Sequence, residues 1–171
     1  RAVLAAISRR GANAAGFAKA SMATEPPLDD INLVERDHDW IDRQLRDYYG
    51  SAWHRPPGRG IYHHRADNVW RVPDSRTALL QRAGVLSELP EPDWSEEAYD
   101  CEDFAFRLYS ALTMAVPRMA VGIAFNFAGG HVYNVFVTAD GEVIEYEPQD
   151  GTVVTDSGRS YYDFEHGILF L

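Results

Sequence analysis

The chain has 171 residues, 46% of them hydrophobic, which is enough for one domain with its own core. Its 26 acidic and 16 basic side chains give a net charge of −10, which argues against nucleic acid or an anionic membrane as the main partner. No stretch approaches the roughly 18 consecutive apolar residues of a transmembrane helix, and no secretory signal is visible. We therefore expect a soluble protein, in a compartment that the sequence leaves open.

Residues 1–27 have the composition of a basic, alanine-rich arm. Residues 1–24 contain four basic side chains and no acid. Helical arms that dock on a neighbour and transit peptides share this composition, so both alternatives stay open. Pro26 and Pro27 break any helix, and we therefore place the folded domain at residues 28–171.

The first half of this domain is predicted to alternate helices with irregular segments. Apolar residues spaced three, four and seven apart predict an amphipathic helix in the second half of 29–49. Prolines and glycines make 50–60 a loop, and 69–72 is a short extended segment. Asp74 or Ser75 is expected to cap a helix that runs to about residue 82.

The second half begins with a helix and continues with strands. From Cys101 onward apolar residues recur at i, i+3, i+4, i+7 and i+8, which predicts a helix that buries one face and ends before Pro117. Runs rich in Val, Ile, Phe and Tyr follow, separated by Gly-Gly and Asp-Gly turns. These runs, expected to form an antiparallel meander, are 121–127, 131–138, 142–147, 152–155 and 168–171. The result is an α+β domain with the Cys101 helix packed on one face of the sheet.

Three of these residues could form a thiol active site. The N-terminus of a helix favours a thiolate at Cys101, the only cysteine of the chain. His131, at the start of a strand, could take the thiol proton and return it to a leaving group. Glu147, on the next strand, could hold the second ring nitrogen, and Glu145 on the same face is the reserve candidate. The alternative is an inert, buried cysteine, since free cysteines are commonly buried.

Three short motifs carry a family resemblance: DCEDFA at 100–105, GHVYN at 130–134 and EPQ at 147–149. Together they resemble the papain-like and transglutaminase-like thiol enzymes. They are most similar to the family of the C-terminal protease domain of the Marasmius oreades agglutinin and its bacterial and phage relatives. The resemblance covers roughly residues 65–155 and lacks the sugar-binding β-trefoil, so it does not imply lectin activity.

The resemblance implies a calcium-activated cysteine endopeptidase with a papain/transglutaminase-like fold. Cys101 would be its nucleophile, His131 its base and Glu147 its third member. Trp94 falls where the family places a tryptophan beside the active site, and it would help backbone N–H groups to hold the oxyanion. Two further positions in the matched motifs are reserve site residues, Asn134 and Gln149.

Acidic side chains surround the cysteine, and their negative charge opposes ionisation of the thiol unless an imidazolium or a bound cation compensates. Calcium requires hard oxygen ligands, which an acid-rich segment could supply. Its candidate ligands are Asp93, Glu96, Glu97, Asp100 and Asp103. The alternative is that these acids only stabilise helix N-termini.

The sequence therefore favours a thiol hydrolase that acts on a protein or peptide substrate. The same three residues would also serve acyl transfer to an amine, as in transglutaminases. A third alternative is a retired enzyme fold that serves as a structural subunit of a larger assembly, with residues 1–24 binding the assembly partner.

Overall fold

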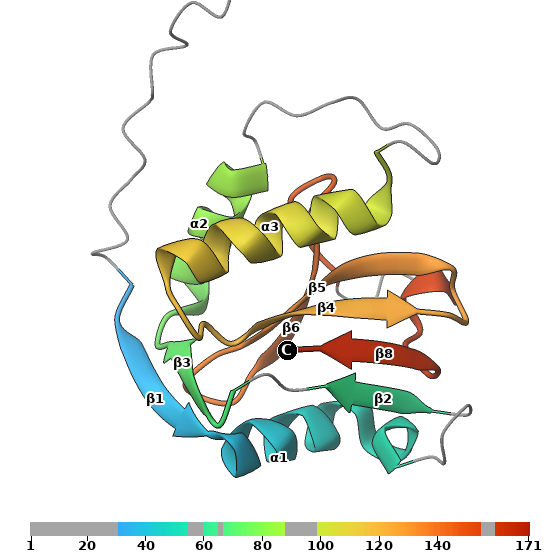
Figure 1. The fold of residues 1–171 in the computed structure, drawn as a ribbon, viewed down its shortest axis with the longest axis horizontal. Helices are drawn as coiled ribbons and strands as arrows, with labels where there is room; N and C mark the ends of the chain where they lie inside the picture. Colours follow the sequence, from blue (N-terminus) through green and yellow to red (C-terminus); the bar gives the residue numbers. More distant parts are fainter. Residues whose placement is uncertain (1–30, 55–59, 65–66, 88–98, 155–159) are drawn as a thin grey trace, which may run out of the picture.

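The computed structural model describes residues 31–54, 60–64, 67–87, 99–154 and 160–171 (Figure 1). None of the described helices is long and apolar enough to cross a membrane. The expected arm at 1–27 lies outside the described residues. The elements, in chain order, are β1 (Leu33–Asp37), α1 (His38–Tyr49), the 3-10 helix η2 (Gly50–His54), β2 (Ile61–His64), β3 (Val69–Pro73), α2 (Arg76–Ser87), α3 (Cys101–Ala115), β4 (Val121–Asn126), β5 (His131–Val137), β6 (Val143–Glu147), β7 (Thr152–Val153), the 3-10 helix η3 (Ser160–Tyr162) and β8 (Gly167–Phe170).

A six-stranded sheet in the order β2-β8-β4-β5-β6-β7 forms the centre of the fold. All neighbours in it are antiparallel except β2 and β8, which are parallel. In Figure 1, α3 lies on one side of the sheet and α1 on the other. The α+β class and the packing of the Cys101 helix on an antiparallel sheet are thus confirmed.

The strand order differs from a simple meander. Strands β4 to β7 follow one another as expected, but β8 returns to the free side of β4 and β2 adds beside it. Strands β1 and β2 were not predicted, and β1 pairs with β3 in a separate two-stranded sheet. Both missed strands are short and partly exposed, so their sequences lack a strong apolar alternation.

Short local signals set the helix ends. The Asp37 side chain accepts a hydrogen bond from the N–H of Trp40 at 2.8 Å and so caps α1. Ser75 caps α2 in the same way, accepting from the N–H of Ala78 at 3.2 Å. Helix α2 continues to Ser87 rather than ending near residue 82, because Leu86 still packs in the core.

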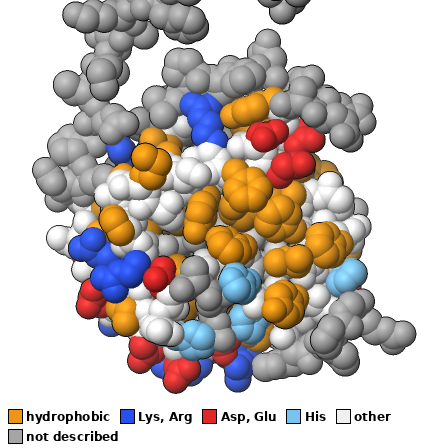
Figure 2. All heavy atoms as spheres, in the orientation of Figure 1, with side chains coloured by type: hydrophobic (Ala, Val, Ile, Leu, Met, Phe, Trp, Pro, Cys, Tyr) orange, Lys and Arg blue, Asp and Glu red, His pale blue; other side chains and the backbone are white. Residues whose placement is uncertain are grey.

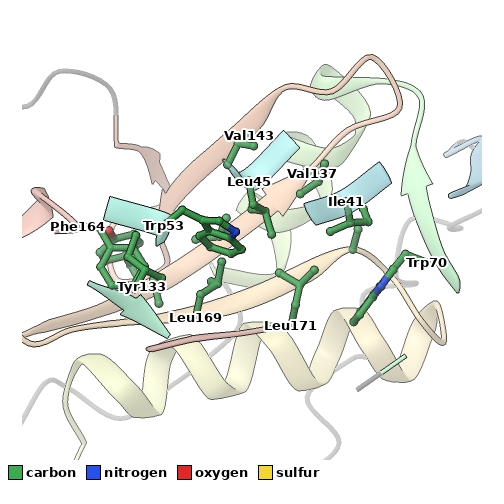
Figure 3. Packing of buried hydrophobic residues seen from close by; sticks show 14 of the residues in the cluster. Ile41, Leu45, Trp53, Trp70, Tyr133, Val137, Val143, Phe164, Leu169 and Leu171 are labelled. Carbon is green, nitrogen blue, oxygen red and sulfur yellow. The ribbon is translucent and has the colours of Figure 1, made fainter. Parts of the chain in front are cut away.

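Two apolar clusters lie on opposite faces of the sheet, because successive side chains of a strand alternate between its faces. Tyr133 of β5 faces α1 and η2, whereas Phe136 of the same strand faces α2 and α3. Figure 3 shows Trp53, Tyr133 and Phe164 together at one end of the first cluster. This alternation decides which side chains of β5 and β6 can reach one another.

Candidate thiol site

Cys101 is the first residue of α3, as the periodicity predicts. The N–H of the preceding Asp100 donates to Oδ2 of Asp103 at 3.2 Å, which stabilises this helix start. Buried Phe104, Ala105 and Leu108 fix the first turns of the helix on the sheet. The thiol therefore lies where the helix supplies free N–H groups and partial positive charge, which favour a thiolate.

The acids beside the thiol contact both it and each other. Oε2 of Glu102 lies 3.5 Å from Sγ of Cys101. A hydrogen bond from the Asp100 side chain is the main reason why the pKa of Glu102 is raised. The carboxyl group of Glu102 therefore holds a proton more strongly than a free glutamate does.

His131 stands at the start of β5, after the turn at 127–130. Its Nε2 lies 2.6 Å from Oε2 of Glu147, and its side chain also interacts with the Cys101 side chain. Burial lowers the pKa of His131, but the hydrogen bonds and charges of Cys101 and Glu147 outweigh it and raise the pKa to about 9. Because Glu147 occupies Nε2, Nδ1 is the nitrogen left to face the thiol. The imidazole therefore joins the cysteine to the carboxylate.

Glu147 ends β6 and is 4% exposed. Besides His131, its Oε2 accepts from the hydroxyl of Tyr162 at 2.7 Å. Its Oε1 accepts from the N–H of Gln149 at 3.0 Å. Three donors thus satisfy a carboxylate that would otherwise be costly to bury.

Glu145, the reserve partner for His131, lies on the same face of β6 but has other partners. Its Oε1 accepts from the hydroxyls of Tyr49 and Tyr133 at 3.0 and 3.1 Å. Burial raises its pKa to about 7, although the tyrosine hydrogen bonds act in the opposite direction. Between the two acids of β6, the one that contacts His131 is Glu147, whereas Glu145 pairs with tyrosines.

The two other reserve residues have different positions. Asn134 is completely buried on the opposite face of β5, where its amide donates to the carbonyl oxygens of Ala105 and Gly122. It connects α3 to the sheet and does not line the site. Gln149 is exposed next to Glu147 and lines a groove beside His131.

Four residues of the sequence hypothesis lie outside the described residues. They are the oxyanion candidate Trp94 and the calcium candidates Asp93, Glu96 and Glu97. Of the remaining calcium candidates, Asp103 already accepts the N–H of Asp100 through Oδ2. Oδ1 of Asp100 is buried without a hydrogen-bond partner in the described part of the chain. Side-chain ligand atoms of Asp100, Cys101 and Glu102 all lie within 4.8 Å of one another.

A polar groove of about 490 Å³ runs beside His131. The turn residues Gly129 and Gly130 line it together with Tyr161 and Tyr162. A separate, fully apolar hollow of about 310 Å³ lies on the face where Figure 2 shows hydrophobic side chains gathered. The residues that line this hollow are Phe106, Phe125, Phe127, Ile168 and Phe170.

Sequence reasoning missed two residues that organise the groove. Tyr162 donates its hydroxyl to Oε2 of Glu147. Asn126 donates to the carbonyls of Tyr161 and Asp163 and accepts from two N–H groups of the 127–130 turn. An asparagine just before a turn is a recognisable signal for Asn126. Nothing local in the sequence pairs Tyr162 with Glu147.

The comparisons with known proteins agree with this architecture. The structure titled "PSL1a-E64 complex" has a TM-score of 0.58 and 19% identity, over 80% of this chain and 51% of that one. A Polyporus squamosus lectin bound to the human-type influenza-binding epitope Neu5Aca2-6Galb1-4GlcNAc has a TM-score of 0.56 and 18% identity, over 80% and 49%. The chain thus spans about half the length of these structures. No curated protein matches it.

A family profile decides the relationship. The profile of the ricin-type β-trefoil lectin C-terminal domain matches residues 36–171, which is most of the chain. These residues include α3, β5 and β6, and with them Cys101, His131 and Glu147. The chain therefore belongs to the family of ricin-type β-trefoil lectin C-terminal domains, and it has their papain-like α+β fold.

Proposed function

We propose that this domain is a cysteine-dependent amide hydrolase that acts on protein or peptide substrates. The observation that carries the proposal is the bonding of His131, which contacts the Cys101 thiol and lies 2.6 Å from the buried Glu147 carboxylate. A nucleophile in reach of a base, with that base oriented by a third group, is the arrangement that nucleophilic catalysis requires.

Each group has a defined task in this proposal. The pKa of His131, raised to about 9, keeps the ring protonated at neutral pH, which suits a thiolate–imidazolium pair. The thiolate attacks the carbonyl carbon, backbone N–H groups at the start of α3 stabilise the oxyanion, and the imidazolium gives its proton to the leaving amine. Water, deprotonated by the neutral imidazole, then hydrolyses the thioester and regenerates the thiol. Glu147 keeps the ring oriented throughout.

The relatives support the proposal. One of the similar structures is a complex with E64, an inhibitor of cysteine proteases, so a protein of this fold binds a ligand made for a thiol site. Peptide hydrolysis by this chain would place a working thiol site in a domain that spans about half the length of that protein.

The decisive experiment is alkylation of Cys101 by iodoacetamide between pH 5 and 9, followed by mass spectrometry. The single cysteine makes the readout unambiguous. We expect fast alkylation below pH 7 that falls at least about tenfold in His131→Ala, because the thiolate loses its cationic partner. His166→Ala, a partly exposed histidine on another loop, is the matched control. Slow alkylation at the same rate in the parent protein and in His131→Ala would favour a retired enzyme fold.

A peptide library then tests turnover, with Cys101→Ala as the negative control. Cleavage that is absent in Cys101→Ala supports hydrolysis. Incorporation of an amine without cleavage would instead assign the site to acyl transfer.

The family resemblance also implies calcium, and the described residues fit this in part. Carboxylate oxygens are the correct donors, and the buried Oδ1 of Asp100 lacks a partner among the described residues. Asp100 and Asp103 would contribute to holding the ion, whose positive charge would favour the thiolate. We expect calcium to raise the melting temperature and to accelerate alkylation of Cys101, and Asp100→Asn to weaken both effects.

A further inference from the structure

Two hydrogen bonds converge on one oxygen of Glu147. Oε2 lies 2.6 Å from Nε2 of His131 and 2.7 Å from the hydroxyl of Tyr162. The other oxygen, Oε1, accepts the N–H of Gln149 within a local turn. Besides His131, Tyr162 is therefore the residue that reaches this carboxylate from a different segment of the described fold.

We propose that Tyr162 is a positioning residue of the thiol site, which holds the Glu147 carboxylate against His131. The inference rests on the proposed function of Cys101, because positioning has meaning only if His131 acts on the thiol. Tyr162 does not touch the reacting atoms in this role and acts through Glu147.

The hydroxyl of Tyr162 is a permanent donor. The pKa of Tyr162 is raised well above its ordinary value. Burial is the largest cause, and the hydrogen bond to Glu147 and the charge of Glu147 add to it. The phenol therefore stays protonated over the whole working range and donates to Oε2. A donor on a buried carboxylate satisfies one of its oxygens and fixes its rotation.

The ring of Tyr162 also packs on the histidine that its hydroxyl supports through Glu147. The Tyr162 and His131 rings meet edge to face, with centroids 5.3 Å apart and an interplanar angle of 73°. Tyr133 packs near both rings, with its centroid 5.5 Å from that of Tyr162 and 6.1 Å from that of His131. Ring packing and hydrogen bonding thus restrain the same imidazole.

The segment that carries Tyr162 is itself tied to the turn that precedes His131. Asn126, which is 2% exposed, donates to the carbonyl oxygens of Tyr161 and Asp163 at 2.8 and 3.1 Å. Its Oδ1 accepts the N–H groups of Ala128 and Gly129, both at 3.1 Å. The backbone on each side of Tyr162 is therefore fixed relative to the turn before β5.

The test compares Tyr162→Phe with Tyr49→Phe. Both variants remove only a hydroxyl that donates to a buried carboxylate of β6, but Tyr49 serves Glu145. A purely structural role predicts similar effects of the two changes. The readouts are the alkylation rate of Cys101 from pH 5 to 9 and an NMR titration of His131, neither of which needs a peptide substrate.

We expect Tyr162→Phe to slow alkylation at pH 6 about tenfold, the worth of one hydrogen bond to a charged group, and to move the acidic limb of the profile to higher pH. Tyr49→Phe should lower stability but leave the profile unchanged. Equal profiles for the two variants would overturn the inference.

Two further measurements separate a folding defect of the variant from a failure of the inference. If Tyr162→Phe does not fold, 3-fluorotyrosine at position 162 replaces it, because its stronger donor should shift the acidic limb to lower pH. An unchanged limb would then overturn the inference. If Cys101 is alkylated as fast in His131→Ala as in the parent protein, the proposed function fails. If His131→Ala slows alkylation but Tyr162→Phe does not, the positioning role alone fails.

Discussion

The amide of Asn134 donates a hydrogen bond to the backbone carbonyl oxygen of Ala105, 3.0 Å away. Asn134 lies three residues after His131 on β5, and Ala105 lies four residues after Cys101 on α3. This one contact therefore links the strand that carries His131 to the helix that carries Cys101. A second bond, to the carbonyl oxygen of Gly122 at 3.2 Å, fixes the same side chain to β4.

Asn134→Ala should consequently weaken both the fold and the thiol site. Loss of two buried hydrogen bonds should lower the free energy of unfolding by about 2–3 kcal/mol, measured by urea denaturation. Alkylation of Cys101 should slow, because α3 is held less firmly relative to His131. The exposed Asn68→Ala is the control; a fully stable Asn134→Ala variant with unchanged alkylation would contradict the assigned role.

The raised pKa of Glu145 predicts that the stability of the fold depends on pH. Its folded pKa of about 7 exceeds its ordinary value of 4.5, so its contribution to stability is complete below pH 4.5 and is lost as the pH rises through 7. Glu145→Gln keeps the shape without the charge. The variant should be more stable than the parent at pH 8, on the order of 2 kcal/mol, with the difference shrinking toward pH 5. Parallel stability curves for the two proteins would refute this.

The raised pKa of His131 predicts a loss of stability in a different pH range. Its pKa is raised to about 9 from an ordinary 6.5, so its stabilisation is fully present below pH 6.5 and is lost as the pH rises through 9. The free energy of unfolding should therefore fall between these values. Glu147→Gln should flatten this fall, because the ring loses its anionic partner. Glu165→Gln, an exposed acid elsewhere, should leave the slope as it is.

Substitution of Gly129 tests how closely the turn before β5 packs against the backbone of Tyr161. A Cβ atom at this position would lie 2.2 Å from the carbonyl oxygen of Tyr161, so backbone must move. Gly129→Ala should destabilise the fold by about 2–3 kcal/mol and slow alkylation, since the segment holding Tyr162 is displaced. Gly84→Ala in α2 is the control: its Cβ meets nothing within 4 Å. That helix should gain about 0.5–1 kcal/mol.

The elements with strong local signals were predictable. The stripe of apolar residues after Cys101 gives the length of α3, and the glycine-containing turns give the limits of β4, β5 and β6. The side-chain alternation of a strand puts Glu145 and Glu147 on one face, but it cannot choose between them. That choice depends on Tyr49, Tyr133 and Tyr162, which surround the two carboxylates from distant parts of the chain.

What could not be predicted depends on pairing between remote segments. The four residues of β2 become a strand because β8 offers a free edge, and β8 lies beside β4 because α1 and the sheet enclose Leu169 and Leu171. Tyr162 reaches Glu147 for the same reason, since it immediately precedes that returning segment. No local pattern encodes such contacts.

The parallel pairing of β2 with β8 also affects the order of events during folding. Ile61 and Gly167 are register partners although more than a hundred residues separate them. Pairings of this kind form slowly, because a long loop must close first. Tyr162 joins Glu147 only when the segment leading into β8 has docked. A nascent or partly folded chain should therefore hold a weakly reactive thiol, and we expect the full reactivity of Cys101 to arise only when folding is complete.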